Sequence, residues 1–131
     1  MNSNKFKHLL FVIVFVLLLG IPVYVLGNKE TSKICPKISE VIQTVTMKED
    51  SFEPETLTIQ KCTQVVFKNQ DKISRWPASN LHPTHGIYPQ FDPKEPVESG
   101  QEWSFVFDRV GKWKYHDHLV PFIRALIDVS D

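Results

Sequence analysis

The 131-residue chain has no net charge, few glycines and only two cysteines. Its 15 basic residues balance 15 acidic ones, and no basic block follows the N-terminus, so a nucleic-acid partner is not expected. With five glycines it contains no glycine-rich loop that could cradle a phosphate, and it shows no nucleophile triad and no convincing carboxylate pair. The average composition excludes collagen-like and disordered classes. At roughly 100–200 residues per domain, the length allows one domain and a short extension.

The first 27 residues differ from the rest of the chain. Lys5 and Lys7 precede an apolar run over residues 9–26, which Pro22 interrupts. A basic flank, an apolar stretch and small residues before a polar boundary are typical of a secretory signal peptide. Without the break at Pro22, the run approaches the ~20 residues that a membrane-spanning helix needs. We expect a cleaved signal peptide or an uncleaved membrane anchor, with a slight preference for cleavage.

In either case we expect the rest of the chain to be exported to the extracellular or periplasmic face. We divide it into a linker, 28–39, and a folded domain, 40–131. An oxidising compartment favours a disulfide between Cys35 and Cys62. Such a bridge would close a loop of about 28 residues and stabilise the fold by roughly 3–4 kcal/mol in the chain-entropy model. Metal ligation and free thiols are the alternatives, although neither cysteine lies near the histidines.

Hydrophobic alternation predicts an all-β domain after this leader. Helical periodicity is scarce, whereas apolar and polar residues alternate in several short runs separated by turn-forming residues. Six or seven short strands without an internal repeat indicate a two-sheet β-sandwich. The predicted strands are residues 41–47, 56–60, 64–68, 102–107, 112–115 and 124–129.

The stretch from 71 to 100 contains five prolines and little alternation, so we predict a long loop with one short strand at 84–88. A loop of this length in a small domain is usually functional or disordered. Trp76, Tyr88 and Phe91 supply apolar surface to bury, which argues against disorder.

Four histidines form two close pairs, His82 with His85 and His116 with His118. Residues two apart in an extended segment point to the same side, and a turn across Pro83 brings residues three apart onto one side. Loops of a sandwich cluster at its ends, so both pairs can meet and share one ion. Scattered surface histidines are the alternative interpretation. An all-imidazole set suits copper, zinc or nickel rather than calcium or magnesium, and copper(II) binds most tightly.

These motifs also resemble the cupredoxins. Residues 111–119 with 125–129 are similar to the C-terminal strand–loop–strand signature of that family, and 65–69 resembles the strand before its first ligand. The closest resemblance is to small bacterial cupredoxin-like proteins that carry Trp-Pro-Ala-Ser-Asn, His-Pro-Thr-His and Tyr-His-Asp-His, here at 76–80, 82–85 and 115–118. The resemblance implies a Greek-key β-sandwich that binds copper.

By position, the resemblance makes His85 the first ligand, puts His116 where a blue-copper protein has cysteine, and brings His118 near the second histidine ligand. His82 has no counterpart in the simplest blue-copper pattern. Asp117 could orient a neighbouring imidazole, with a solvated loop carboxylate as the alternative.

The chain also departs from the family pattern. No cysteine follows Cys62, and the only methionines are Met1 and Met47, so a thiolate-based blue site cannot form in the C-terminal loop. Arg75 stands where relatives are expected to carry a further histidine.

The sequence therefore predicts an exported copper-binding domain that carries copper or electrons through a histidine-rich, non-blue site, with zinc as the less favoured metal. A redox or copper-delivery protein is the expected partner, and the membrane is involved only through residues 9–26. An electron-transfer or metal-binding role is favoured over an enzyme. A small copper-dependent redox enzyme and a metal-free binding module are the alternatives.

Overall fold

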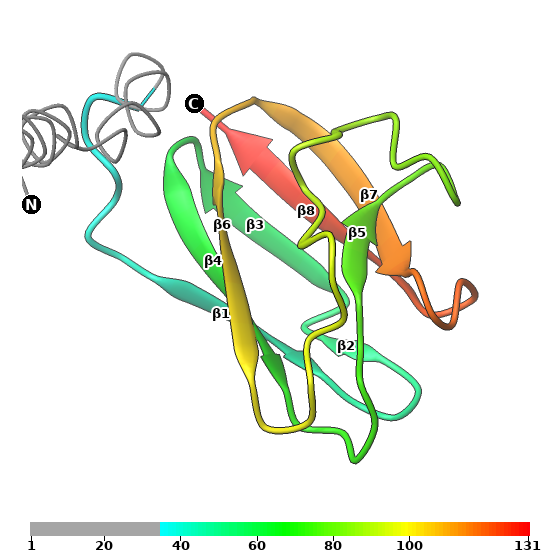
Figure 1. Cartoon of the computed structure of the whole chain (residues 1–131). Helices are drawn as coiled ribbons and strands as arrows, with labels where there is room; N and C mark the ends of the chain where they lie inside the picture. The colour runs from blue at the N-terminus through cyan, green and yellow to red at the C-terminus, as the bar shows by residue number, and fades with distance from the viewer. Residues whose placement is uncertain (1–34) are drawn as a thin grey trace, which may run out of the picture. The chain divides into compact units, whose positions relative to one another are not determined.

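The computed structural model describes residues 35–131, which form two four-stranded sheets around a shared core (Figure 1). One sheet has the order β2-β1-β4-β6 and the other β3-β8-β7-β5. The predicted all-β, two-sheet architecture is confirmed. The strands are β1 (Gln43–Met47), β2 (Phe52–Glu53), β3 (Thr56–Gln60), β4 (Thr63–Asn69), β5 (Pro77–Ser79), β6 (Glu102–Phe107), β7 (Gly111–Asp117) and β8 (Arg124–Ser130).

The predicted leader, 1–27, lies outside the described residues, and the assignment of 28–39 to a linker stays a prediction. Within the part of the chain that the structure describes, no helix has the length and hydrophobicity that a bilayer crossing requires.

Strand alternation builds the core from both sheets. In β8 the side chains of Ala125, Ile127 and Val129 are buried, and the residues between them are partly exposed. β4 shows the same alternation, with Val65 and Phe67 inside. Because successive side chains of a strand point to opposite faces, each strand contributes one apolar row to the interior. β1 runs parallel to β4 and β3 parallel to β8, while β7 is antiparallel to both β8 and β5.

The predicted strand at 84–88 is wrong, and β5 is the strand that this region contains. The amides of His85 and Ile87 bond to the carbonyls of Leu81 and Asn80, so residues 84–88 form turns and have no ladder partner. β5 escaped prediction because it begins with Pro77. Proline is tolerated as the first residue of a strand, where its missing N–H costs no ladder bond.

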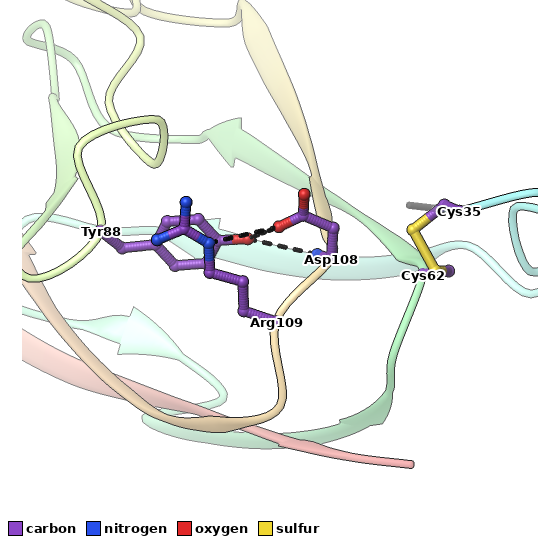
Figure 2. Close-up of a disulfide and its surroundings, with 5 residues drawn as sticks. All are labelled: Cys35, Cys62, Tyr88, Asp108 and Arg109. Carbon is purple, nitrogen blue, oxygen red and sulfur yellow. Dashed lines mark hydrogen bonds and ion pairs between the residues drawn. A yellow bond between two sulfur atoms is a disulfide. The ribbon is translucent and has the colours of Figure 1, made fainter. Parts of the chain in front are cut away.

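The long connection between β5 and β6 is ordered because its aromatic residues are buried. Phe91 is fully buried and stacks on Trp103 and Phe105 of β6, with ring centroids 5.9 and 5.4 Å apart. Tyr88 is also fully buried, and its hydroxyl bonds to the carboxylate of Asp108 (Figure 2). Burial, together with Asp108, raises the pKa of Tyr88, so this O–H stays protonated and donates. These contacts fix the path of the loop that carries His82 and His85.

A disulfide joins Cys35 to Cys62, which directly precedes β4 (Figure 2). The two Cα atoms are 5.5 Å apart and the residues are separated by 27 positions in the sequence. The bridge ties the start of the described chain to the sandwich, and the Ser39 amide strengthens this link by donating to the Cys62 carbonyl at 2.9 Å.

Candidate metal centre

The pairing of β5 with β7 brings the two histidine pairs together. Ala78 of β5 lies opposite His116 of β7. The loop directly after β5 carries His82 and His85, and His118 follows the end of β7. Segments more than 30 residues apart in the sequence therefore converge beside this strand pair.

His116 is buried although it does not belong to the apolar core. Alternation along β7 puts Tyr115 and His116 on opposite faces, and Tyr115 belongs to the core cluster. His116 is nevertheless only 1% exposed. The reason is the loop after β5, whose His82 and His85 rings lie with centroids 5.3 and 5.4 Å from the His116 ring.

Each of the four imidazoles offers one nitrogen to a common point. These four atoms all lie within 4.8 Å of one another. His82 Nδ1 is 3.2 Å from His116 Nε2, and His85 Nε2 is 2.9 Å from His118 Nδ1. Nitrogens that bind one ion at the usual metal–nitrogen distance lie about 3–4 Å apart. Only small movements would let all four bind a single ion.

The rings of His85 and His116 are oriented by hydrogen bonds on the side that faces away from the other imidazoles. The outer nitrogen of His85, Nδ1, lies 2.6 Å from the Asp92 carboxylate. The outer nitrogen of His116, also Nδ1, lies 3.0 Å from the side-chain oxygen of Asn80. Both acceptors require a proton on Nδ1, so in each ring the Nε2 lone pair faces the other imidazoles. Partners of this kind fix the tautomer and orientation of metal-binding histidines.

His118 and His82 complete the hydrogen bonding among the four rings. Since Nε2 of His85 and of His116 carry lone pairs, they accept from Nδ1 of His118 and of His82. For these two rings to bind a metal through Nδ1, the proton must shift to Nε2. Neutral imidazole is the form of each ring that binds a metal.

Asp92 is itself well anchored. Its carboxylate accepts from the Trp76 indole at 2.9 Å and from the Lys94 ammonium at 2.8 Å, in addition to His85. Burial alone would raise the pKa of Asp92, but hydrogen bonds from Lys94 and His85 outweigh it and lower the pKa. The group is therefore an anion at neutral pH. The Trp76 ring also lies 4.6 Å from the His118 ring, so it contacts both sides of the centre.

Electrostatics keep two of the rings neutral. Burial, followed by the neighbouring imidazoles of His85, His82 and His118, lowers the pKa of His116 to about 4. Burial, with His85 and His82, also lowers the pKa of His118. Both rings are therefore uncharged at neutral pH, as metal binding requires.

Asp117, which sequence analysis suggested as a group that orients an imidazole, bonds elsewhere. Its carboxylate accepts from Arg75 Nη1 at 3.0 Å and from the backbone amides of Trp76 and Leu119 at 3.2 and 2.9 Å. Arg75 is 2% exposed and also pairs with Asp71. Burial would lower the pKa of Arg75, but its bonds to the two carboxylates outweigh this and raise it. This ion-pair network holds the segments on either side of the centre.

Comparison with known proteins identifies the fold. No protein-family model and no curated protein sequence matches the chain. Among solved structures, a purple cupredoxin from Nitrosopumilus maritimus matches with a TM-score of 0.59 and 22% identity, over 67% of this chain and 99% of that one. A reduced amicyanin variant matches with a TM-score of 0.60 and 18% identity, over 73% and 89%. The domain has the cupredoxin fold.

Within this cupredoxin fold, sequence analysis missed the two residues that orient the rings of His85 and His116. Asp92 precedes a proline and reads as a turn former. Asn80 closes the Trp-Pro-Ala-Ser-Asn motif without any sign of its role. In the sequence, their only link to the centre is that both lie in or beside the segment that carries His82 and His85. Their contacts with the rings depend on how that loop folds back, which the sequence pattern does not indicate.

Proposed function

We propose that this domain binds one copper(II) ion through His82, His85, His116 and His118 and carries it outside the cytoplasm. The observation that carries the proposal is the convergence of four imidazole nitrogens within 4.8 Å. Two of the four rings have outer hydrogen bonds that direct their lone pairs inward. A chance cluster of histidines has no need of such partners.

The donor set favours copper. Four nitrogen donors suit copper, zinc and nickel and are unsuited to calcium and magnesium, which prefer oxygen. Copper(II) forms the most stable complexes of the divalent first-row ions, and zinc is its main competitor. Both cysteines are joined in the disulfide, and Met47 is buried in the apolar core. A histidine-only centre of non-blue character follows.

Residues around the four histidines prepare the rings for binding. Asp92 and Asn80 fix the rings of His85 and His116, and the neutral state of His116 and His118 keeps their lone pairs free. The Arg75–Asp117 pair links the two segments. Bound copper would be the cargo. Export is supported by the signal-like N-terminal sequence and by the disulfide, which an oxidising compartment permits.

Copper carriage is favoured over rapid electron transfer. Nitrogen donors stabilise copper(II), and without a thiolate the site should reorganise considerably when the metal is reduced. Cyclic voltammetry of the copper-loaded protein should show slow, poorly reversible cycling. Rapid reversible cycling would favour electron transfer instead.

Metal titration tests the proposal. The protein should take up one equivalent of copper(II), and should take up zinc more weakly. The double variant His116→Ala/His118→Ala should lose this uptake, while the surface control Lys112→Ala should keep it. Uptake by the double variant that equals that of the wild type would reject the assigned ligands.

A further inference from the structure

The four imidazoles of the centre are held unequally. His85 and His116 are 4% and 1% exposed, and their outer nitrogens bond to Asp92 and Asn80. His118 is partly exposed and lies against the Trp76 ring. His82 alone of the four is exposed. Among residues 35–131, its one hydrogen bond is the contact of Nδ1 with His116, and its outer nitrogen has no protein partner.

We propose that His82 is the exchangeable ligand, the one that detaches when copper enters or leaves, and that the acceptor binds through the position it vacates. The inference rests on the proposed function and adds the route by which the cargo is handed over. The acceptor is a protein or peptide that presents an imidazole donor, because imidazole binds copper(II), whereas soft thiolate donors select copper(I) and would require a change of oxidation state.

The cost of moving each ring differs. If His85 turned away, its 2.6 Å bond to Asp92 would break, and that 9%-exposed carboxylate would lose a partner in a buried place. Trp76 and Lys94 would remain as partners of Asp92, but a hydrogen bond to an ionised carboxylate is one of the stronger kinds, so its loss is unfavourable. If His116 turned away, it would leave the Asn80 side chain and vacate a position that is almost fully buried.

Movement of His82 carries none of these costs. Its ring can turn toward solvent and lose the 3.2 Å contact with His116 and its ring contacts with His116 and His118, without leaving a buried partner such as Asp92 or Asn80 behind, and its freed nitrogen would then be solvated. The residue before it, Leu81, is 63% exposed, so the vacated position opens at the surface rather than into the core. Three ligands would retain the metal while the fourth position faces an incoming donor.

The exchange step is a simple substitution. His82 breaks its coordinate bond and keeps the electron pair on Nδ1, and a donor of the acceptor supplies the pair for the new bond. Copper keeps its oxidation state, and no oxidant or reductant takes part.

Rapid-mixing kinetics tests this on the full chain loaded with copper(II), with EDTA as the acceptor. In the wild type, the transfer rate should level off as EDTA concentration rises, because detachment of His82 comes first. In His82→Ala the rate should rise linearly with EDTA and exceed the wild-type plateau at least about tenfold, since changes in affinity are expressed mainly in dissociation rates. Added free imidazole should fill the vacated position in this variant, restore the fourth nitrogen in the paramagnetic resonance spectrum and slow the transfer.

The matched variant is His118→Ala, which removes the ring packed against Trp76. It should weaken copper binding more than His82→Ala does. The inference is overturned if His82→Ala transfers copper at the wild-type rate, or if it loses copper binding as completely as His116→Ala while its metal-free form melts like the wild type. Wild-type protein that takes up no copper would instead overturn the proposed function, and the inference with it.

Discussion

The hydrogen bond from His85 to Asp92 leads to a prediction about Asp92, a residue outside the four-histidine group. In Asp92→Asn, copper(II) binding should weaken by about 10–100-fold, the usual effect of removing a partner behind a metal-binding histidine. That range corresponds to about 1.4–2.7 kcal/mol. The native carboxylate lies 2.6 Å from Nδ1 of His85 and carries a negative charge because its pKa is lowered.

Two effects act together in this variant. The new amide has no charge, so any hydrogen bond it accepts from His85 is weaker than the native one. If instead its N–H group faces Nδ1, the imidazole proton must move to Nε2, the nitrogen that faces the other three rings. In that tautomer His85 cannot bind the metal without first losing its bond to residue 92.

A competition titration with a chelator of known affinity measures this change. Asp128→Asn is the matched control, since it makes the same substitution at a surface carboxylate that pairs with Lys112 at 3.4 Å. The control should bind copper like the wild type. Thermal melting of the metal-free proteins shows whether Asp92→Asn also disturbs the loop. Wild-type affinity, within twofold, in Asp92→Asn would refute the reasoning about His85.

Three further predictions concern stability. Replacing both Cys35 and Cys62 by Ser should lower the free energy of unfolding by about 2–4 kcal/mol, as measured by urea denaturation. A reductant should cause the same loss in the wild type. Equal unfolding midpoints in the variant, the reduced wild type and the oxidised wild type would contradict this prediction. Arg75→Met leaves the buried Asp117 carboxylate without its cation, so it should lower the free energy of unfolding by about 3–5 kcal/mol. Adding Asp117→Asn should recover part of this loss. If the double variant loses as much stability as the two single variants together, the result would count against the pair. Burial and the neighbouring imidazoles lower the pKa of His116 to about 4, so as pH falls the unfolded chain, titrating near 6.5, binds the proton first. The metal-free protein should therefore lose up to about 3 kcal/mol between pH 6.5 and 4, a slope that His116→Ala should reduce; an unchanged slope in that variant would contradict the assignment.

The architecture follows largely from strand alternation. Six strands predicted from the sequence correspond to β1, β3, β4, β6, β7 and β8, because each presents one apolar row to the core. β2 and β5 have two and three residues, too few for a pattern to emerge. β5 is also determined from outside, since its partner β7 supplies the ladder bonds and its own sequence begins with proline.

The candidate centre was predictable in part. That the two histidines of each pair lie on one side of the chain could be predicted, because this depends only on their spacing in the sequence and on local backbone geometry. The positions of Asp92 and Asn80 behind the rings depend on the path of the loop after β5, which is set by the burial of Tyr88 and Phe91. Arg75 looked like the loss of a histidine, and only its buried partners explain why an arginine stands there.

The central claim is that four imidazoles share one copper(II) ion, and paramagnetic resonance of the copper-loaded protein tests it most directly. The account predicts one equivalent of copper per chain, with hyperfine coupling to four imidazole nitrogens that falls away in His116→Ala/His118→Ala. A spectrum without nitrogen coupling, or one that is identical in the double variant, would contradict it.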